Sequence, residues 1–193
     1  MSRMRRCVVA AAAAGCVLGL GACGSSPSAS SGSTTTAGSS ILPLSSIVSL
    51  SEVQQQFPEV TRQESTGPNS TSSGTPGATR QVIYANGDSS KKVTVSVDQY
   101  PSTGAASSAF QEAVDKSQKV AGFTALPAPD IGQKASAGIV TQGTESHVGV
   151  GSVSGRLIIQ ATIAGYATSP ENISKIQDVA GSEVAHAKAA LGG

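Results

Sequence analysis

The sequence predicts an α+β domain: an antiparallel sheet of about five strands, with two long helices packed on it and a short N-terminal helix. Three observations indicate this class. Apolar and polar residues alternate over residues 91–100, as in a half-buried strand. Apolar residues recur at helical spacing in two longer stretches, residues 101–120 and 169–191. The expected order of elements is helix, two strands, helix, three strands and helix, which is typical of this class.

The domain is expected to begin with a short helix and a loop. Residues 51–57 predict one to two helical turns, with Ser51 as the N-cap, and Pro58 ends the helix. Residues 63–79 are rich in Gly, Pro, Ser and Thr, so we expect a flexible loop there.

A β-hairpin follows this loop. Residues 81–85 and 91–100 are its strands, and the polar residues 86–90 connect them. In the second strand one face carries valines and the other carries polar side chains: Val93, Val95 and Val97 against Thr94, Ser96 and Asp98. This alternation predicts that only one face of the hairpin meets the core.

The second half of the domain is expected to hold a helix over 101–120 and then three strands. The strands are predicted near residues 138–142, 145–153 and 156–163. Ser154-Gly155 is the expected two-residue turn between the last two strands. Gly149 and Gly151 interrupt the middle strand, which indicates a bulge or a close backbone approach.

The last helix has the clearest boundaries. Ser169 is the expected N-cap, Pro170 occupies the first helical position, and Gly192 follows the last turn. One stripe of apolar residues is expected to lie on the sheet: Ile173, Ile176, Ala180, Val184, Ala187 and Leu191.

The N-terminus has the layout of a cleavable export signal. Three arginines lie within its first six residues, and an apolar run occupies residues 7–20. That run is shorter than the roughly 20 residues that a membrane-spanning helix requires. We therefore expect a signal peptide over residues 1–22. The pair Arg5-Arg6 leaves both general and twin-arginine export open.

The apolar run ends in Leu20-Gly21-Ala22-Cys23, which resembles the lipobox of bacterial lipoproteins. The resemblance implies that a signal peptidase recognises Leu20, Gly21 and Ala22 and cleaves before Cys23. It also implies an S-diacylglycerol group on the Cys23 thiol and a fatty acid such as palmitate on the new amino group. Because two or three chains anchor durably, we expect an exported protein held by lipid on the outer face of the cell membrane.

Residues 23–40 are expected to form a tether, and residues 41–193 a single domain. The tether is almost entirely Ser, Thr, Gly and Ala without charge, so it cannot bury apolar area and is predicted to be disordered. As a flexible coil it spans roughly 20–25 Å. O-linked sugar on its hydroxyl groups and a bare spacer are both compatible with this composition.

The charge balance and the cysteines exclude several classes of partner. The signal takes three of the thirteen basic residues, which leaves ten against twelve acidic ones. We therefore expect no nucleic acid partner and no polybasic attraction to lipid. Cys7 and Cys16 leave with the signal and Cys23 takes lipid, so no disulfide and no thiolate metal site are expected.

Few residues suggest catalysis. Glu145 and His147 share one face of a strand, but without a visible third partner we interpret them as solvated side chains. His186, three residues after Glu183 on the last helix, is also expected on the surface. We assign no catalytic residue, no metal ligand and no cofactor.

The element order and helix pattern of residues 80–191 resemble mycobacterial envelope lipoproteins with a PsbP-like sandwich. They are also similar to extracellular sensor domains of mycobacterial receptor kinases, although this chain lacks the disulfide cysteines of those domains. The leading hypothesis is a non-catalytic, lipid-anchored binding or adaptor module whose partner is an unknown envelope protein or ligand. The alternative is a carrier of a lipid or other apolar ligand, which requires an apolar cavity. A cryptic hydrolase is the third hypothesis.

Overall fold

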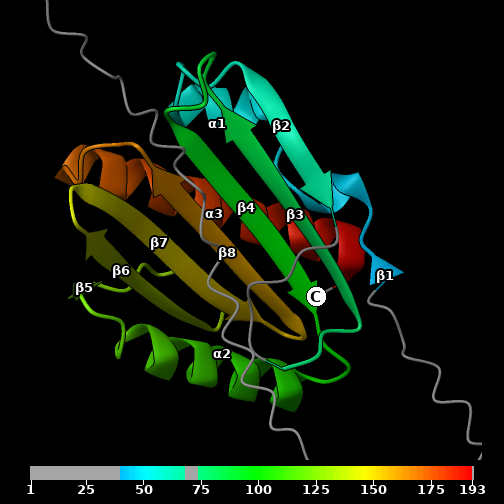
Figure 1. Cartoon of the computed structure of the whole chain (residues 1–193). Helices are drawn as coiled ribbons and strands as arrows, with labels where there is room; N and C mark the ends of the chain where they lie inside the picture. Colours follow the sequence, from blue (N-terminus) through cyan, green and yellow to red (C-terminus); the bar gives the residue numbers. More distant parts are fainter. Residues whose placement is uncertain (1–39, 68–73, 193) are drawn as a thin grey trace, which may run out of the picture. The chain divides into compact units, whose positions relative to one another are not determined.

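The computed structural model describes residues 40–67 and 74–192, which form one large mixed sheet with helices on both faces (Figure 1). The strand order is β1-β3-β4-β8-β7-β6-β5, and β2 also pairs with β3. The strands are β1 Ser40–Ile41, β2 Arg62–Gly67, β3 Ala78–Ala85, β4 Lys92–Gln99, β5 Phe123–Leu126, β6 Lys134–Gln142, β7 Glu145–Ser154 and β8 Leu157–Ala164. The helices are the 3-10 turn η1 Leu44–Ser46, α1 Leu50–Gln56, α2 Thr103–Ser117 and α3 Pro170–Leu191.

The predicted fold, an antiparallel sheet of about five strands under two long helices, is wrong. The described residues form eight strands, and β1 pairs with β3 in parallel. Only α3, with 22 residues, is a long helix, because α2 ends at Ser117 after 15. The three additional strands β1, β2 and β5 have two, six and four residues. β1 and β5 are too short to show an alternation in the sequence, and β2 consists of polar residues and one glycine.

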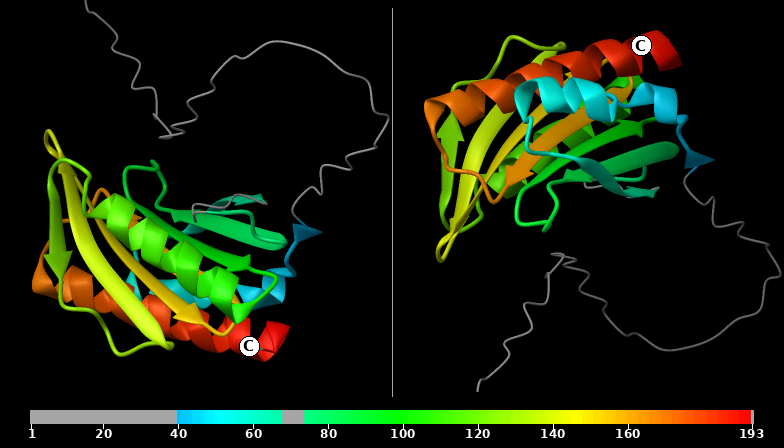
Figure 2. Two further views of the ribbon diagram at one scale, coloured as in Figure 1. Left: turned by 90° about the horizontal axis from the view of Figure 1, so that it is seen from below. Right: turned by 90° about the horizontal axis from the view of Figure 1, so that it is seen from above.

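One face of the sheet is fully covered. Helix α3 runs across it with α1 beside it, as the right view of Figure 2 shows. Val95 of β4 and Ile159 of β8 are fully buried there against Ile176 and Ala180 of α3. The predicted alternation of the β4 valines and the predicted apolar stripe of the last helix are thus both confirmed.

Among the described residues, a helix covers the opposite face at one end only. Helix α2 packs on β7 and β8, where Phe110, Ala106 and Ala109 meet Val153 and Ile158 in a second, smaller core. Figure 1 shows α2 below the lower ends of these strands and no helix in front of β3, β4 and the rest of β8. The helices therefore lie on opposite faces of the sheet, and this arrangement leaves part of one face without a helix.

The ends of the elements test the predictions residue by residue. Ser169 caps α3, and Gly192 ends it in a left-handed conformation, as predicted. Helix α1 is capped by Ser49 instead of Ser51, because Ser49 and Glu52 form a reciprocal capping box. The β7–β8 turn is Gly155-Arg156, one residue later than predicted, since Ser154 pairs with Leu157.

Several predicted segments lie partly or wholly outside the described residues. Of the residues expected to form a loop over 63–79, residues 63–67 belong to β2 and residues 78–79 belong to β3. Residues 68–73 are not described, nor are the predicted signal peptide, the lipobox and most of the tether, residues 1–39. Among the helices that are described, none has the length and apolar character needed to span a membrane.

Candidate functional site

Where no described helix covers the α2 side of the sheet, the middle strands carry polar residues and glycines, and Ile83 of β3 lies beside them as the partner of Thr94. Strands β4, β8 and β7 are neighbours, and cross-strand partners project on the same side. On the α2 side their middle residues are Thr94 and Ser96 of β4, Gln160 and Thr162 of β8, and Gly149 and Gly151 of β7. We call these six residues the open face. All six are half-buried except Ser96, which is buried.

The two glycines of the open face have different roles. A Cβ on Gly151 would lie 3.3 Å from the Phe110 ring, so the absence of a side chain there helps to seat α2. A Cβ on Gly149 would meet only the Thr162 Cγ2 atom, at an ordinary contact distance of 3.5 Å. Packing within the described structure therefore does not require glycine at position 149. The sequence had indicated a close backbone approach here, and Gly151 is where the protein itself makes one.

A groove with a volume of about 380 Å³ continues the open face at one end. We call it the end groove. Its walls come from the β3–β4 loop, the β6–β7 turn and the end of β8: Ser89, Ser90, Lys92, Thr144, Glu145, Ser146, His147, Ala164, Gly165 and Tyr166. Lys92, Ala164 and His147 are cross-strand neighbours on the same side as the open face. The end groove and the open face are therefore one continuous polar surface.

Glu145 and His147, predicted to share one face, both line the end groove. Both side chains are exposed, as the sequence interpretation expects. In the described part of the chain, neither a hydrogen bond nor an ion pair joins the His147 ring to Glu145 or to a serine hydroxyl. The pair therefore lacks the nucleophile–base contact that catalysis of the serine-hydrolase type requires.

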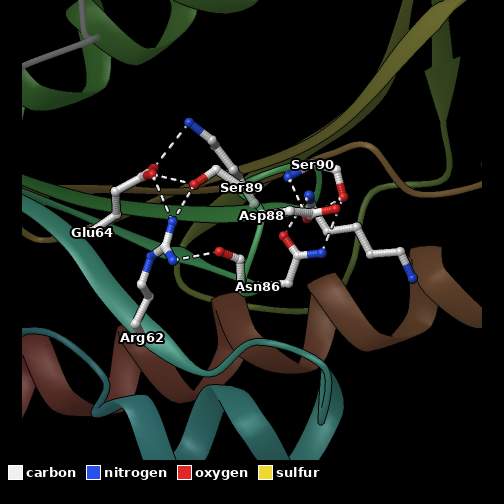
Figure 3. A network of polar contacts seen from close by, with 9 residues as sticks. Arg62, Glu64, Asn86, Asp88, Ser89 and Ser90 are labelled. Carbon is white, nitrogen blue, oxygen red and sulfur yellow. Dashed lines mark hydrogen bonds and ion pairs between the residues drawn. The ribbon is translucent and has the colours of Figure 1, made fainter.

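An ion-pair network holds the loop beside the end groove (Figure 3). Arg62 donates to the Gly87 carbonyl oxygen at 2.6 Å and also to Ser89. Glu64 accepts from the Ser89 hydroxyl and pairs with the Lys92 ammonium at 2.9 Å. These contacts, led by the Ser89 hydrogen bond, lower the pKa of Glu64 to about 2. The charges of this wall are therefore satisfied within the protein.

The same loop folds on itself and on the β8 end. Asp88 accepts from the Ser90 main-chain N–H at 3.0 Å and from its hydroxyl at 2.7 Å. Gly165 has a φ of 78°, and a Cβ there would lie 1.9 Å from the Ser90 carbonyl oxygen. Only glycine allows this approach between the two segments, so the shape of the end groove depends on it.

Tyr166 lines the end groove on the side that adjoins the apolar core. Its ring meets Phe57 edge-on at 5.0 Å between centroids, and the Lys91 ammonium lies 5.1 Å from the ring centroid. Lys91 also pairs with Glu59 at 3.3 Å. Burial raises the pKa of the Tyr166 hydroxyl. The lysines next to the groove are thus engaged with carboxylates.

A second polar cluster, away from the groove, was missed by the sequence analysis. Glu183 is fully buried on α3, and its Oε2 accepts from the Val48 main-chain N–H at 2.7 Å. Its Oε1 has no hydrogen-bond partner within the described structure. Burial raises the pKa of Glu183 to about 8. The signal was available, because position 183 falls on the same helical stripe as Ile176, Ala180 and Ala187.

His186, expected on the surface, is partly exposed and makes one specific contact. Its Nε2 lies 2.7 Å from Oε1 of Glu52 on α1. The Glu52 pKa falls to about 2, mainly because of its hydrogen bonds with Ser49. Tyr84 of β3 donates to the Val48 carbonyl oxygen. These contacts fasten the segment that follows the tether to α3 and to the sheet.

The remaining predicted site residues, Leu20, Gly21, Ala22 and Cys23, lie outside the described residues. Across residues 40–67 and 74–192, no three His, Cys, Asp or Glu side chains are grouped so that they could hold a metal ion.

The fold is that of an extracellular domain from a mycobacterial kinase. One similar solved structure is the extracellular domain of PknH from Mycobacterium tuberculosis, with a TM-score of 0.54 and 15% sequence identity. The match covers 72% of this chain and 93% of that domain. At this identity the two chains share a fold, which agrees with the resemblance to kinase sensor domains. Neither a protein-family model nor a curated protein sequence matches this chain.

Proposed function

We propose that this chain is an exported, lipid-anchored and non-catalytic binding module of the cell envelope. The observation that carries the binding role is the open face, continuous with the end groove and left without a helix. Leu20-Gly21-Ala22-Cys23 supports the anchor. The fold likeness to an extracellular domain is consistent with an exported protein.

The contacts of the groove hydroxyls favour binding over catalysis. Ser89 donates to Glu64 and Ser90 donates to Asp88, so both serine hydroxyls hold the loop in shape. A nucleophilic hydroxyl needs a partner basic enough to take its proton, whereas the pKa of Glu64 is lowered to about 2 and that of Asp88 is lowered too, mainly by these hydrogen bonds. The hydrolase hypothesis therefore has no supporting contact in the end groove.

The apolar-carrier alternative is less well supported. A carrier requires a cavity with mostly apolar walls. The end groove is lined by serines, a threonine, charged side chains and His147 as well as by Ala164, Gly165 and Tyr166, and of these only Tyr166 belongs to an apolar core. We therefore place the ligand on the polar surface and not between the sheet and α3.

Thiol labelling tests the binding role directly. If Cys23 carries lipid, the mature wild-type chain has no free thiol and supplies the blank. Single variants Thr162→Cys on the open face and Gln118→Cys on the exposed end of α2 are then labelled with a maleimide. We expect Thr162→Cys to react more slowly in isolated envelopes than in detergent, because a bound ligand covers it. Gln118→Cys should react at the same rate in both.

For each position, the labelling rate in detergent is divided by the labelling rate in envelopes. Equal ratios at positions 162 and 118 would contradict the proposal. In that case the open face is free in its native surroundings. Denaturation in each preparation, followed by complete labelling, controls for the amount of chain and for oxidation of the introduced thiol.

A further inference from the structure

We propose that the start of the domain lies on the lipid surface to which the chain is anchored, with the side chains of Ile41 and Leu44 inserted among the lipid head groups. We call these two residues the entry patch. The proposal rests on the lipid anchor of the proposed function and adds the orientation of the domain on the membrane. It follows from four properties of this region: its exposed apolar side chains, its rigidity, its charge and its distance from Cys23.

The first property is the exposure of large apolar side chains. Among the described residues three of them are exposed: Ile41 by 55%, Leu44 by 50% and Val120 by 39%. Single exposed apolar residues are common on protein surfaces. The entry patch differs because its two residues are the most exposed of the three and lie close together in the chain, at the start of the domain. Neither belongs to an apolar core of the described structure.

The second property is rigidity. The residues that alternate with and follow the entry patch point into the core, since Leu42, Ile47 and Val48 are buried. The Leu42 N–H donates to the Thr79 carbonyl oxygen at 3.1 Å, and Arg80 donates to the Leu42 carbonyl oxygen. The entry patch is therefore held in one orientation on the domain, and its contact with a surface orients the whole domain.

The third property is charge. Arg80 lies beside the entry patch through its hydrogen bond to Leu42, and Lys188 is exposed in the last turn of α3. The right view of Figure 2 shows this end of α3 beside β1 and η1. Within the described part of the chain neither cation forms an ion pair, and the carboxylate of Glu52 on the adjoining α1 is paired with His186. Cations beside exposed apolar groups favour a lipid surface with anionic head groups.

The fourth property is the distance to the predicted lipid. Ile41 follows Cys23 by 18 positions. A flexible coil of this length spans roughly 20–25 Å on average, so an anchored Cys23 keeps the entry patch within reach of the bilayer. Two side chains alone would bind a membrane weakly. The anchor raises their effective concentration at the bilayer, so a weak contact is sufficient.

This orientation directs the end groove away from the membrane. β1 pairs with the start of β3, which lies opposite Gln99 at the end of β4. Lys92, at the other end of β4, lines the end groove. The eight residues of β4 span about 23 Å, so the groove lies up to that much farther from the bilayer than the entry patch. The end groove therefore faces the envelope, where a ligand reaches it without crossing the lipid surface.

The test uses the full mature chain in vesicles of phosphatidylcholine and phosphatidylglycerol. A single introduced cysteine carries an environment-sensitive fluorophore, either Ser45→Cys beside the entry patch or Thr144→Cys at the end groove, and both positions are exposed. The quencher is a nitroxide attached to phosphatidylcholine near its head group. We expect quenching at position 45 to be at least about threefold greater than at position 144, because interfacial apolar groups lie about 5–10 Å into the head-group boundary.

Matched variants assign the quenching to the entry patch. Ile41→Thr with Leu44→Gln removes the exposed apolar groups, and threonine still suits a strand. We expect this double variant to reduce quenching at position 45 to the level at position 144. Val120→Gln is the control, because Val120 is also exposed but lies near the opposite end of the sheet, and quenching at position 45 should stay at the wild-type level. Urea unfolding should give unchanged midpoints, as expected of exposed positions.

Three results would overturn the inference. The first is equal quenching at positions 45 and 144, and the second is full quenching at position 45 in the double variant. The third is a label at position 45 that is shielded from iodide in the water but not quenched by the lipid nitroxide. That result would mean that another segment of this chain, or a second copy, covers the entry patch.

Vesicle flotation separates these results from failure of the proposed function. A chain that does not float with the vesicles lacks the anchor, which rejects both the anchored module and its orientation. A chain that floats but shows no greater quenching at position 45 keeps the anchored module and rejects only the orientation.

Discussion

The buried carboxyl group of Glu183 accepts a hydrogen bond at 2.7 Å from the main-chain N–H of Val48, a residue 135 positions earlier. This bond joins the C-terminal helix to the segment through which the predicted tether enters the domain. Tyr84 binds the carbonyl oxygen of the same residue. Val48 is therefore held at both of its polar main-chain groups, and the entry segment is fixed in the core.

Glu183 predicts a fall in stability with rising pH. Its pKa is about 8 in the folded chain and takes the ordinary value of 4.5 when unfolded, because burial disfavours the charged form. Between these values the folded state keeps a proton that the unfolded state releases. The free energy of unfolding should therefore fall by at most about 1.4 kcal/mol per pH unit over this window.

Glu183→Gln isolates this effect. Glutamine keeps an oxygen that can accept from Val48 but does not titrate, so the variant should lose the decline between pH 5 and pH 8. The other shifted groups titrate elsewhere: the lowered pKa of Glu52 acts below 4.5, and the raised pKa of Tyr84 acts above 10. Urea unfolding at several pH values measures the slope. An equal slope in wild type and variant would contradict the assignment.

Gly165 is predicted to be indispensable for the end groove. Alanine there would combine a left-handed φ with a Cβ 1.9 Å from the Ser90 carbonyl oxygen. We expect Gly165→Ala to lose at least about 3 kcal/mol of stability, as large single-site effects do. Gly143→Ala is the matched control, since φ is 62° but no atom lies near its Cβ.

The control should lose only about 1 kcal/mol, the strain of the left-handed conformation alone. Thermal or urea unfolding of both variants gives the comparison. Equal losses would show that the contact between the Gly165 and Ser90 segments is not as close as described.

The capping of α1 distinguishes two neighbouring serines. Ser49 accepts from the Glu52 main-chain N–H, and Glu52 reaches back to the Ser49 N–H. Ser49→Ala should therefore cost about 1 kcal/mol of stability. Ser51→Ala, within the first turn, should change stability by less than about 0.5 kcal/mol. Urea unfolding would contradict this assignment if Ser51→Ala proved the more damaging of the two.

Elements with a strong local pattern were predicted from the sequence, and elements that form through long-range pairing were missed. The β4 valines and the caps of α3 follow from alternation and from end residues alone. Strand β1 exists because two residues pair with β3 nearly 40 positions later, and no local pattern reveals this. For Glu183 the sequence shows its position on the apolar stripe of α3, but not the hydrogen bond with Val48 that explains a carboxyl group there.

The candidate site was predictable in part. Glu145 and His147 were placed on one face, and the structure locates both in the end groove. The open face was hidden, although Thr94 and Ser96 were assigned to the side away from the valines. Whether such a side is covered depends on where α2 packs, which is a tertiary property. Cys23 and the three residues before it remain a prediction.

Intact mass of the native protein, combined with detergent phase partitioning, tests the anchored module most directly. Wild type and Cys16→Ser, which alters only the predicted signal peptide, should enter the detergent phase. Each should have the mass of residues 23–193 plus a diacylglyceryl group and a fatty acyl group. Cys23→Ser should lack both additions and leave the detergent phase. A Cys23→Ser chain that stays in the membrane with the wild-type processing would contradict the account.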